Sequence, residues 1–169
     1  MYVMSLQVED EFGNVVSEQR NLRNQLHRGG EEFLLRATFT GGRVSDIIPE
    51  DYYIGLDNRS AIAYEHTMGD IIGEPNVGGY RRQAISSSGE FSLNFESDHF
   101  RAVSPIVAFR SQTIAWGPVQ NLFLSDQDGY DGTLISTVPL DSAIFLNPGQ
   151  TSKIRIAMTM RELPDCSES

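Results

Sequence analysis

Along most of the chain, apolar and polar side chains alternate with the period of two that is typical of a β-strand. The alternation is clearest over residues 91–95 and 154–160. Clusters of Gly, Pro, Asn and Asp separate such segments, as expected for turns between short strands. The other predicted strands cover residues 52–56, 82–86, 103–110, 113–125, 133–138 and 143–146. This pattern predicts a mainly β fold, an antiparallel β-sandwich or a jelly-roll-like arrangement.

The first twenty residues have the pattern of a β-hairpin. Met4, Leu6 and Val8 alternate with polar neighbours, and residues 12–14 supply the turn. We therefore divide the chain into a hairpin arm (residues 1–20), a β-sandwich domain (residues 21–163) and a polar tail (residues 164–169).

One stretch has convincing helical spacing. Phe33, Leu34 and Ala37 form an apolar stripe, and Glu31 and Glu32 stand where a helix N-terminus favours acids. The pattern predicts a short helix over residues 30–38, and a further helical turn is possible around residues 60–66.

The alternation also predicts which side chains fill the interior, because every second residue of a strand faces the same side. The predicted core residues are Phe91, Leu93, Phe95, Val107, Phe109, Leu122, Leu124, Ile154, Ile156 and Met158.

The formal net charge of −10 argues against nucleic acid as a partner, because phosphate binding needs a basic surface. No apolar run approaches the ~20 residues of a membrane span, and residues 1–12 do not resemble a signal peptide. We thus expect no membrane partner and assembly in the host cytoplasm. Lys153 is the only lysine. Either a GC-rich genome or a high-salt (halophilic) host explains that bias.

Motifs that carry chemistry are missing from the sequence. His27, His66 and His99 fit no zinc-binding spacing, and there is no nucleophile elbow or phosphate-binding glycine loop. We therefore expect no enzyme, no catalytic residues and no cofactor. A triad assembled only by the fold stays open, because triads are recognised by geometry.

The segment from Asp126 to Gly132 is the one candidate cation site. Asp126, Asp128 and Asp131 stand close together beside glycines, and calcium prefers such oxygen ligands. The alternative is an ordinary turn, since Asp and Gly are also favoured there.

Several segments, taken in order, carry a family resemblance. They are EEFLLRATFTGG (31–42), YYIGL (52–56), GEP (73–75), GYR (79–81), WG (116–117) leading into VQNLFLSD (119–126), GTLISTVPL (132–140) and the PG turn (148–149). Together they resemble a family of small virion proteins of tailed phages or tailed archaeal viruses, labelled tail-fibre, minor structural or decoration proteins. Residues 1–20 and Pro118 depart from the pattern.

The resemblance implies a virion structural protein that contacts other virion proteins and copies of itself as a homo-oligomer. Capsid decoration and a tail or neck position both stay open. An alternative is a carbohydrate- or receptor-binding module, whose aromatic pool would be Tyr52, Tyr53, Tyr64, Tyr80 and Trp116. A small hydrolase is the third hypothesis.

Exposed apolar residues outside the predicted core are the expected interface. They are Met1, Tyr2, Val3 and Met4 of the hairpin and Ile71, Ile72 and Val77 of the long loop 57–79. The alternatives are that the hairpin joins its own sheet and that the loop folds onto its own core.

Overall fold

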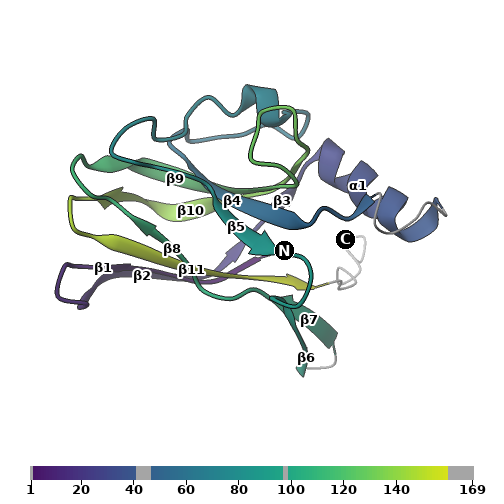
Figure 1. Cartoon of the computed structure of the whole chain (residues 1–169), viewed down its shortest axis with the longest axis horizontal. Helices are drawn as coiled ribbons and strands as arrows, with labels where there is room; N and C mark the ends of the chain where they lie inside the picture. The colour runs from purple at the N-terminus through teal and green to yellow at the C-terminus, as the bar shows by residue number, and fades with distance from the viewer. Residues whose placement is uncertain (1, 41–46, 97–98, 160–169) are drawn as a thin grey trace, which may run out of the picture.

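The computed structural model describes residues 2–40, 47–96 and 99–159, whose strands form two antiparallel sheets packed face to face (Figure 1). The predicted β-sandwich is confirmed. The first sheet contains β1 (Tyr2–Glu9), β2 (Val15–Arg23), β6 (Ser92–Glu96), β7 (His99–Val103), β8 (Val107–Arg110) and β11 (Thr151–Thr159). The second contains β3 (Gln25–Leu26), β4 (Asp51–Asp57), β5 (Gln83–Ser86), β9 (Trp116–Ser125) and β10 (Leu134–Leu146).

The order of the first sheet is β2-β1-β11-β7-β6, with β8 also paired to β11. β1 pairs with most of β11, from Glu9 opposite Thr151 to Tyr2 opposite Ala157. The predicted hairpin is therefore present, but it is part of the sandwich's own sheet and not a separate arm.

The order of the second sheet is β3-β10-β9-β4-β5. The chain passes from β2 of the first sheet to β3 of the second across Asn24. Five residues before this crossing, the Gln19 side-chain amide donates to the Ser142 carbonyl (2.8 Å) and accepts from the Asp141 backbone N–H (2.9 Å). These bonds join the two sheets along one side of the sandwich.

Helix α1 (Arg28–Phe39) begins two residues earlier than predicted. Gly29 and Gly30 form its first turn because the helix lies directly against β10, where a side chain at Gly30 would overlap the backbone of Ile135. The helical turn considered possible around residues 60–66 is not a helix. That segment contains a single hydrogen-bonded turn, in which the His66 N–H donates to the Ala63 carbonyl (3.1 Å). A short 3-10 helix, η1 (Met68–Asp70), forms a little later, where Thr67 and Asp70 build a capping box. Among the described residues, no helix is long and apolar enough to cross a membrane.

Two predicted strands or pairs of strands differ most from the structure. Residues 103–110 form no single strand, because Ser104, Pro105 and Ile106 separate β7 from β8. Both short strands nevertheless pair with β11. Conversely, the strands predicted at 133–138 and 143–146 are one strand, β10, whose register shifts between Pro139 and Ile144.

The main core lies between the sheets, and most of the predicted interior is confirmed. Val107, Phe109, Leu122, Leu124, Ile154 and Ile156 are buried. Phe91 and Met158 are partly buried against this core. A second, smaller cluster beneath the loop 57–79 contains Ile62, Met68, Ile71, Phe123 and Leu134.

Leu93 and Phe95 were predicted to be interior and are exposed. Their alternation is real and places both on one face of β6. That part of the sheet, however, carries β6 and β7 away from the second sheet, so nothing in the described chain covers the face (Figure 1).

We expect Ile156→Ala to lower the free energy of unfolding by roughly 2–5 kcal/mol, because it leaves a cavity in the core. Phe95→Ala, at an exposed position, is expected to change it by only about 0.5 kcal/mol or less. Urea unfolding followed by the fluorescence of Trp116, the single tryptophan, measures both. Equal losses at the two positions would contradict this assignment of the interior.

Candidate interaction surfaces

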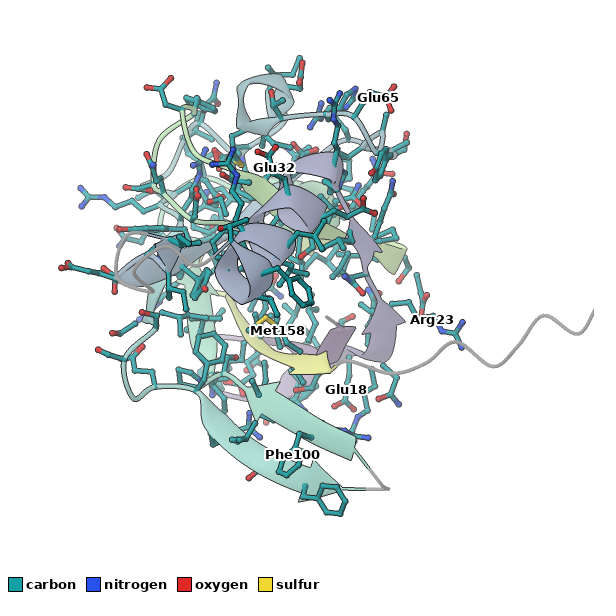
Figure 2. The ribbon with its side chains drawn as sticks, turned by 90° about the vertical axis from the view of Figure 1, so that its right-hand side faces the viewer. Glu18, Arg23, Glu32, Glu65, Phe100 and Met158 are labelled. Atoms are coloured by element: carbon teal, nitrogen blue, oxygen red, sulfur yellow. The ribbon has the colours of Figure 1, made fainter. Side chains whose placement is uncertain are left out.

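The hairpin formed by β6 and β7 projects from the sandwich (Figure 1), and Figure 2 shows the side chain of Phe100 on it. In its register Leu93 stands opposite Ala102 and Phe95 opposite Phe100, so these four residues share one face. Ala102 in turn stands opposite Met158 of β11. Since Ile154 and Ile156 alternate in step with Met158, the hairpin face continues the core-facing side of the first sheet.

Three large side chains on this hairpin face are mostly in water. Leu93 is 70%, Phe95 63% and Phe100 61% exposed. The rings of Phe95 and Phe100 contact each other with centroids 5.0 Å apart. With ~150–250 Å² per aromatic side chain, the three expose roughly 300 Å², the size of the patches that often mark interaction sites on monomers.

A second apolar surface lies at the tip of the β1–β2 hairpin. Phe12 is 81% exposed, and Val15 and Val16 are more than half exposed. The tip is held rigidly, because the Asp10 carboxylate accepts hydrogen bonds from the backbone N–H groups of Phe12 (2.9 Å) and Asn14 (2.8 Å) and from the Asn14 side chain (2.9 Å). These bonds lower the pKa of Asp10, with the Asn14 side chain as the largest cause.

The two apolar surfaces lie at opposite ends of the same strand. Glu9, which leads into the β1–β2 tip, pairs with Thr151 at the start of β11. Arg101 of the β6–β7 hairpin pairs with Thr159 at the end of β11. Nine residues of strand correspond to a separation on the order of 30 Å.

Fewer residues of helix α1 contact the sandwich than its predicted apolar stripe of Phe33, Leu34 and Ala37 indicated. Phe33 makes an edge-on contact with Tyr52, with ring centroids 6.2 Å apart. Leu34 is exposed, as are Leu35 and Phe39, which lie one helical turn apart.

The structure places the predicted interface residues in different environments. Met1 lies outside the described residues, and Tyr2, Val3 and Met4 belong to β1, the strand between β2 and β11 in the first sheet. Ile71 is fully buried in the smaller core cluster and offers no contact surface. Ile72 and Val77 are exposed.

The loop 57–79 folds onto its own domain. The Asn58 N–H donates to the Gly73 carbonyl (2.8 Å), and the Trp116 indole N–H donates to the Val77 carbonyl (3.0 Å). Arg59 forms an ion pair with the buried Asp57 (3.0 Å). Tertiary bonds therefore order this long loop without a second subunit.

The acidic loop after β9 is closed by protein groups. The Asp126 carboxylate accepts from the Thr133 N–H (2.6 Å), and the loop carbonyls of Asp128 and Gly129 accept from the Arg82 guanidinium (2.7 and 2.9 Å). In the described part of the chain, no three or more His, Cys, Asp or Glu side chains are grouped to hold a metal. Asp126, Asp128 and Asp131 are thus not assembled as a ligand set, and calcium binding stays a prediction.

Arg82 is the centre of a buried polar network. Its side chain is 4% exposed and forms a two-pronged ion pair with Glu74, whose side chain is 10% exposed, at 2.8–2.9 Å. The guanidinium also lies over the rings of Phe123 and Tyr130. This one side chain ties β5 to the loop 57–79 and to the acidic loop.

Tyr80 completes the network. Its hydroxyl donates to Glu74 (3.2 Å) and accepts from the Leu56 N–H of β4 (2.8 Å). Burial, and then the adjacent Glu74 charge, raise the pKa of Tyr80 far above its ordinary value. The phenol therefore stays protonated and remains a hydrogen-bond donor.

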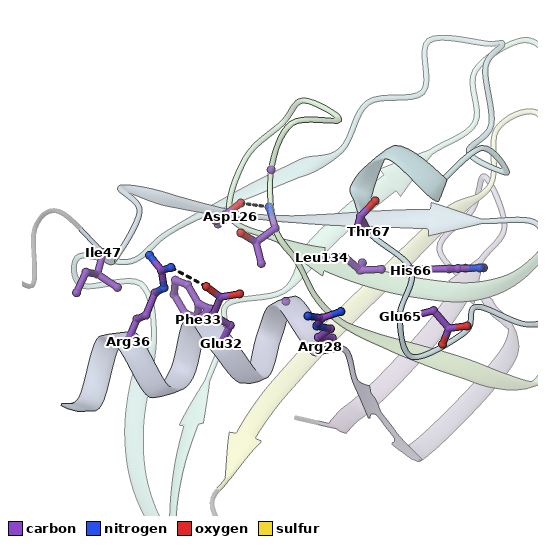
Figure 3. Close-up of a pocket in the computed structure, with 13 residues that line it drawn as sticks. Arg28, Glu32, Phe33, Arg36, Ile47, Glu65, His66, Thr67, Asp126 and Leu134 are labelled. Atoms are coloured by element: carbon purple, nitrogen blue, oxygen red, sulfur yellow. Dashed lines mark hydrogen bonds and ion pairs between the residues drawn. The ribbon is translucent and has the colours of Figure 1, made fainter. Parts of the chain in front are cut away.

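An open pocket of about 570 Å³ lies between α1, the turn at residues 65–67 and the acidic loop (Figure 3). Its lining contains side chains of both charges. Several of its polar side chains form hydrogen bonds or ion pairs with one another or with the backbone. Arg36 pairs with Glu32 (2.7 Å), and Nδ1 of His66 accepts from the Ala63 N–H (3.2 Å). The described lining includes the hydroxyl groups of Thr67 and Thr133 but no serine, cysteine or lysine. These contacts support no particular reaction.

The aromatic residues considered for a sugar site do not form one surface. Trp116 is buried, and Tyr52, Tyr53 and Tyr80 are partly buried. Tyr64 is the exposed member, and its hydroxyl donates to Glu31 (2.7 Å).

His27 is fully buried at the start of α1. Its Nδ1 lies 3.2 Å from the Tyr64 carbonyl and its Nε2 2.9 Å from the Thr137 hydroxyl. Since a carbonyl only accepts, Nδ1 carries the proton and Nε2 accepts from Thr137. Burial lowers the pKa of His27 below 6.5, and the nearby His66 acts in the same direction.

Comparisons of the chain with protein-family models, with curated proteins and with solved structures find no match. The family resemblance therefore stays a prediction, and the function has to be argued from the surfaces themselves. The β6–β7 face and the β1–β2 tip were missed from sequence. On the β6–β7 face, the alternation that normally marks a core is present, but no described part of the chain covers it. The exposed residues of the tip, Phe12, Val15 and Val16, follow no such alternation.

Replacing Arg82 with Met is expected to lower the free energy of unfolding by about 3–5 kcal/mol, because the Glu74 carboxylate is left buried without its partner. Arg82→Met/Glu74→Leu should recover part of the loss, since the buried charge is removed as well. Chemical unfolding of both variants checks this. A double variant less stable than the single one would contradict the ion-pair explanation.

Protonation of His27 should destabilise the fold at low pH. Because its folded pKa is below the unfolded value, the unfolded state takes up a proton first as the pH falls below about 6.5. The stability difference between the wild type and His27→Gln should thus be constant above that pH. Below it, the difference should shift against the wild type until the folded pKa is reached. Unfolding free energies between pH 7.5 and 5 measure this, and a flat difference would refute it.

Proposed function

We propose that the chain is a non-catalytic structural protein of a tailed-virus particle, which acts through contacts with other virion proteins and with its own copies. The observation that carries the proposal is the apolar face of the β6–β7 hairpin. A sheet face with two phenylalanines and a leucine more than 60% exposed is suited to burial against protein.

The energetics of the β6–β7 face agree with a contact role. Burying roughly 300 Å² at about 25 cal/mol per Å² corresponds to ~7 kcal/mol before the costs of association. Phenylalanine is also enriched in the cores of protein–protein interfaces. The acidic chain, with its net charge of −10, favours protein over nucleic acid as the partner.

The polar groups with the strongest interactions serve the scaffold. Arg82, Glu74 and Tyr80 bond to one another, and His27 bonds to Tyr64 and Thr137. A rigid scaffold with contact surfaces agrees with the virion family that the sequence resembles. Capsid decoration and a tail or neck position remain the two versions of this proposal.

Mass spectrometry of virus particles purified on density gradients from the host that carries the gene tests the proposal. We expect the chain at a fixed number of copies relative to the major capsid protein. Immunogold labelling with an antibody to the chain then distinguishes the shell from the tail. Particles that lack the chain would overturn the proposed function.

A further inference from the structure

We propose that copies of this chain assemble by head-to-tail contact, in which the β1–β2 tip of one copy docks on the β6–β7 face of the next. This inference rests on the proposed function in that both use the β6–β7 face. It names a second copy of the chain as the occupant.

The chain itself carries the two surfaces that such a contact needs. One is a projecting apolar tip with Phe12, Val15 and Val16, and the other is an apolar face with Leu93, Phe95 and Phe100. They lie at opposite ends of β11, so a copy that receives a tip on its face still has its own tip available. Such an arrangement forms a two-fold pair or a larger ring where the rotation between copies closes, and an open filament where it does not.

The tip is already held in one conformation. The Asp10 carboxylate fixes the turn through Phe12 and Asn14, and two backbone bonds join Asp10 to Asn14 (2.9 Å) and Gly13 to Asp10 (3.1 Å). A preorganised turn that holds an exposed phenylalanine loses little conformational entropy on binding. This organisation suits a docking element better than a turn that only connects two strands.

The size of the surfaces indicates more than one contact per copy. Roughly 300 Å² on the face is well below the ~800 Å² per partner of a stable interface. A single tip-to-face contact would therefore be weak. A closed assembly gives every copy two such contacts, and linked weak contacts bind tightly together.

Two complementary variants test the geometry. Phe12→Ser/Val16→Ser removes the tip and keeps the face, whereas Leu93→Ser/Phe95→Ser removes the face and keeps the tip. Phe145→Ser is the matched control, because Phe145 is 59% exposed on β10 of the other sheet. Circular dichroism and urea unfolding establish that each variant folds like the wild type.

Sedimentation velocity and native mass spectrometry from micromolar to millimolar concentration provide the measurement. We expect the wild type and Phe145→Ser to self-associate and each surface variant alone to be monomeric. An equimolar mixture of the two surface variants contains one intact tip and one intact face. It should therefore form a 1:1 heterodimer through that single weak contact at the millimolar end of the range. This restored pairing is not expected from any contact of the face with itself.

Three results would overturn the head-to-tail contact. They are self-association of the tip variant at the wild-type level, no pairing in the mixture at millimolar concentration, and a wild type that stays monomeric at that concentration. None of these affects the detection of the chain in purified particles, so the proposed function can stand if this contact fails. Conversely, if the chain associates head to tail but is absent from purified particles, the proposed contact is supported and the proposed virion role is refuted.

Discussion

Alternation along β11 organises the first sheet and much of the core. One side of the strand pairs with β1 from Thr151 to Ala157, and the other pairs with β8 and then with β7. Because side chains of neighbouring strands in register share a face, the inward direction of Ile154 and Ile156 sets the inward direction of the strands paired to them. The same register makes the β6–β7 hairpin an extension of the core face beyond the reach of the second sheet.

Buried polar contacts anchor the long connections to the sandwich. Loops carry backbone groups that no sheet satisfies, and these need partners. Arg82 supplies donors to the carbonyls of the acidic loop while Glu74 balances its charge. His27 does the same for the connection around Tyr64. The polar residues that would otherwise suggest chemistry thus hold the scaffold together.

Because the scaffold is held by these contacts, the apolar side chains exposed on it cannot easily rearrange to become buried. A phenylalanine on a flexible tail can collapse onto its own protein, but Phe12 lies in a hydrogen-bonded turn and Phe95 on a strand paired with β7. Their exposure is therefore a property of the folded chain, and it is the basis for proposing assembly as the chain's role. Two unlike surfaces at the two ends of one sheet are suited to contacts that repeat from copy to copy.

Local pattern alone determined the fold class, most strand positions, the helix near residue 30 and the inward side chains of β8, β9 and β11. These follow from periodicity, which depends only on neighbours in the chain. Tertiary structure decided what covers each face. It left Leu93 and Phe95 in water, buried Ile71, merged two predicted strands into β10 and joined the N-terminal hairpin to β11. Alternation specifies that one side of a strand is apolar, but only the position of the second sheet determines whether that side is a core or a surface.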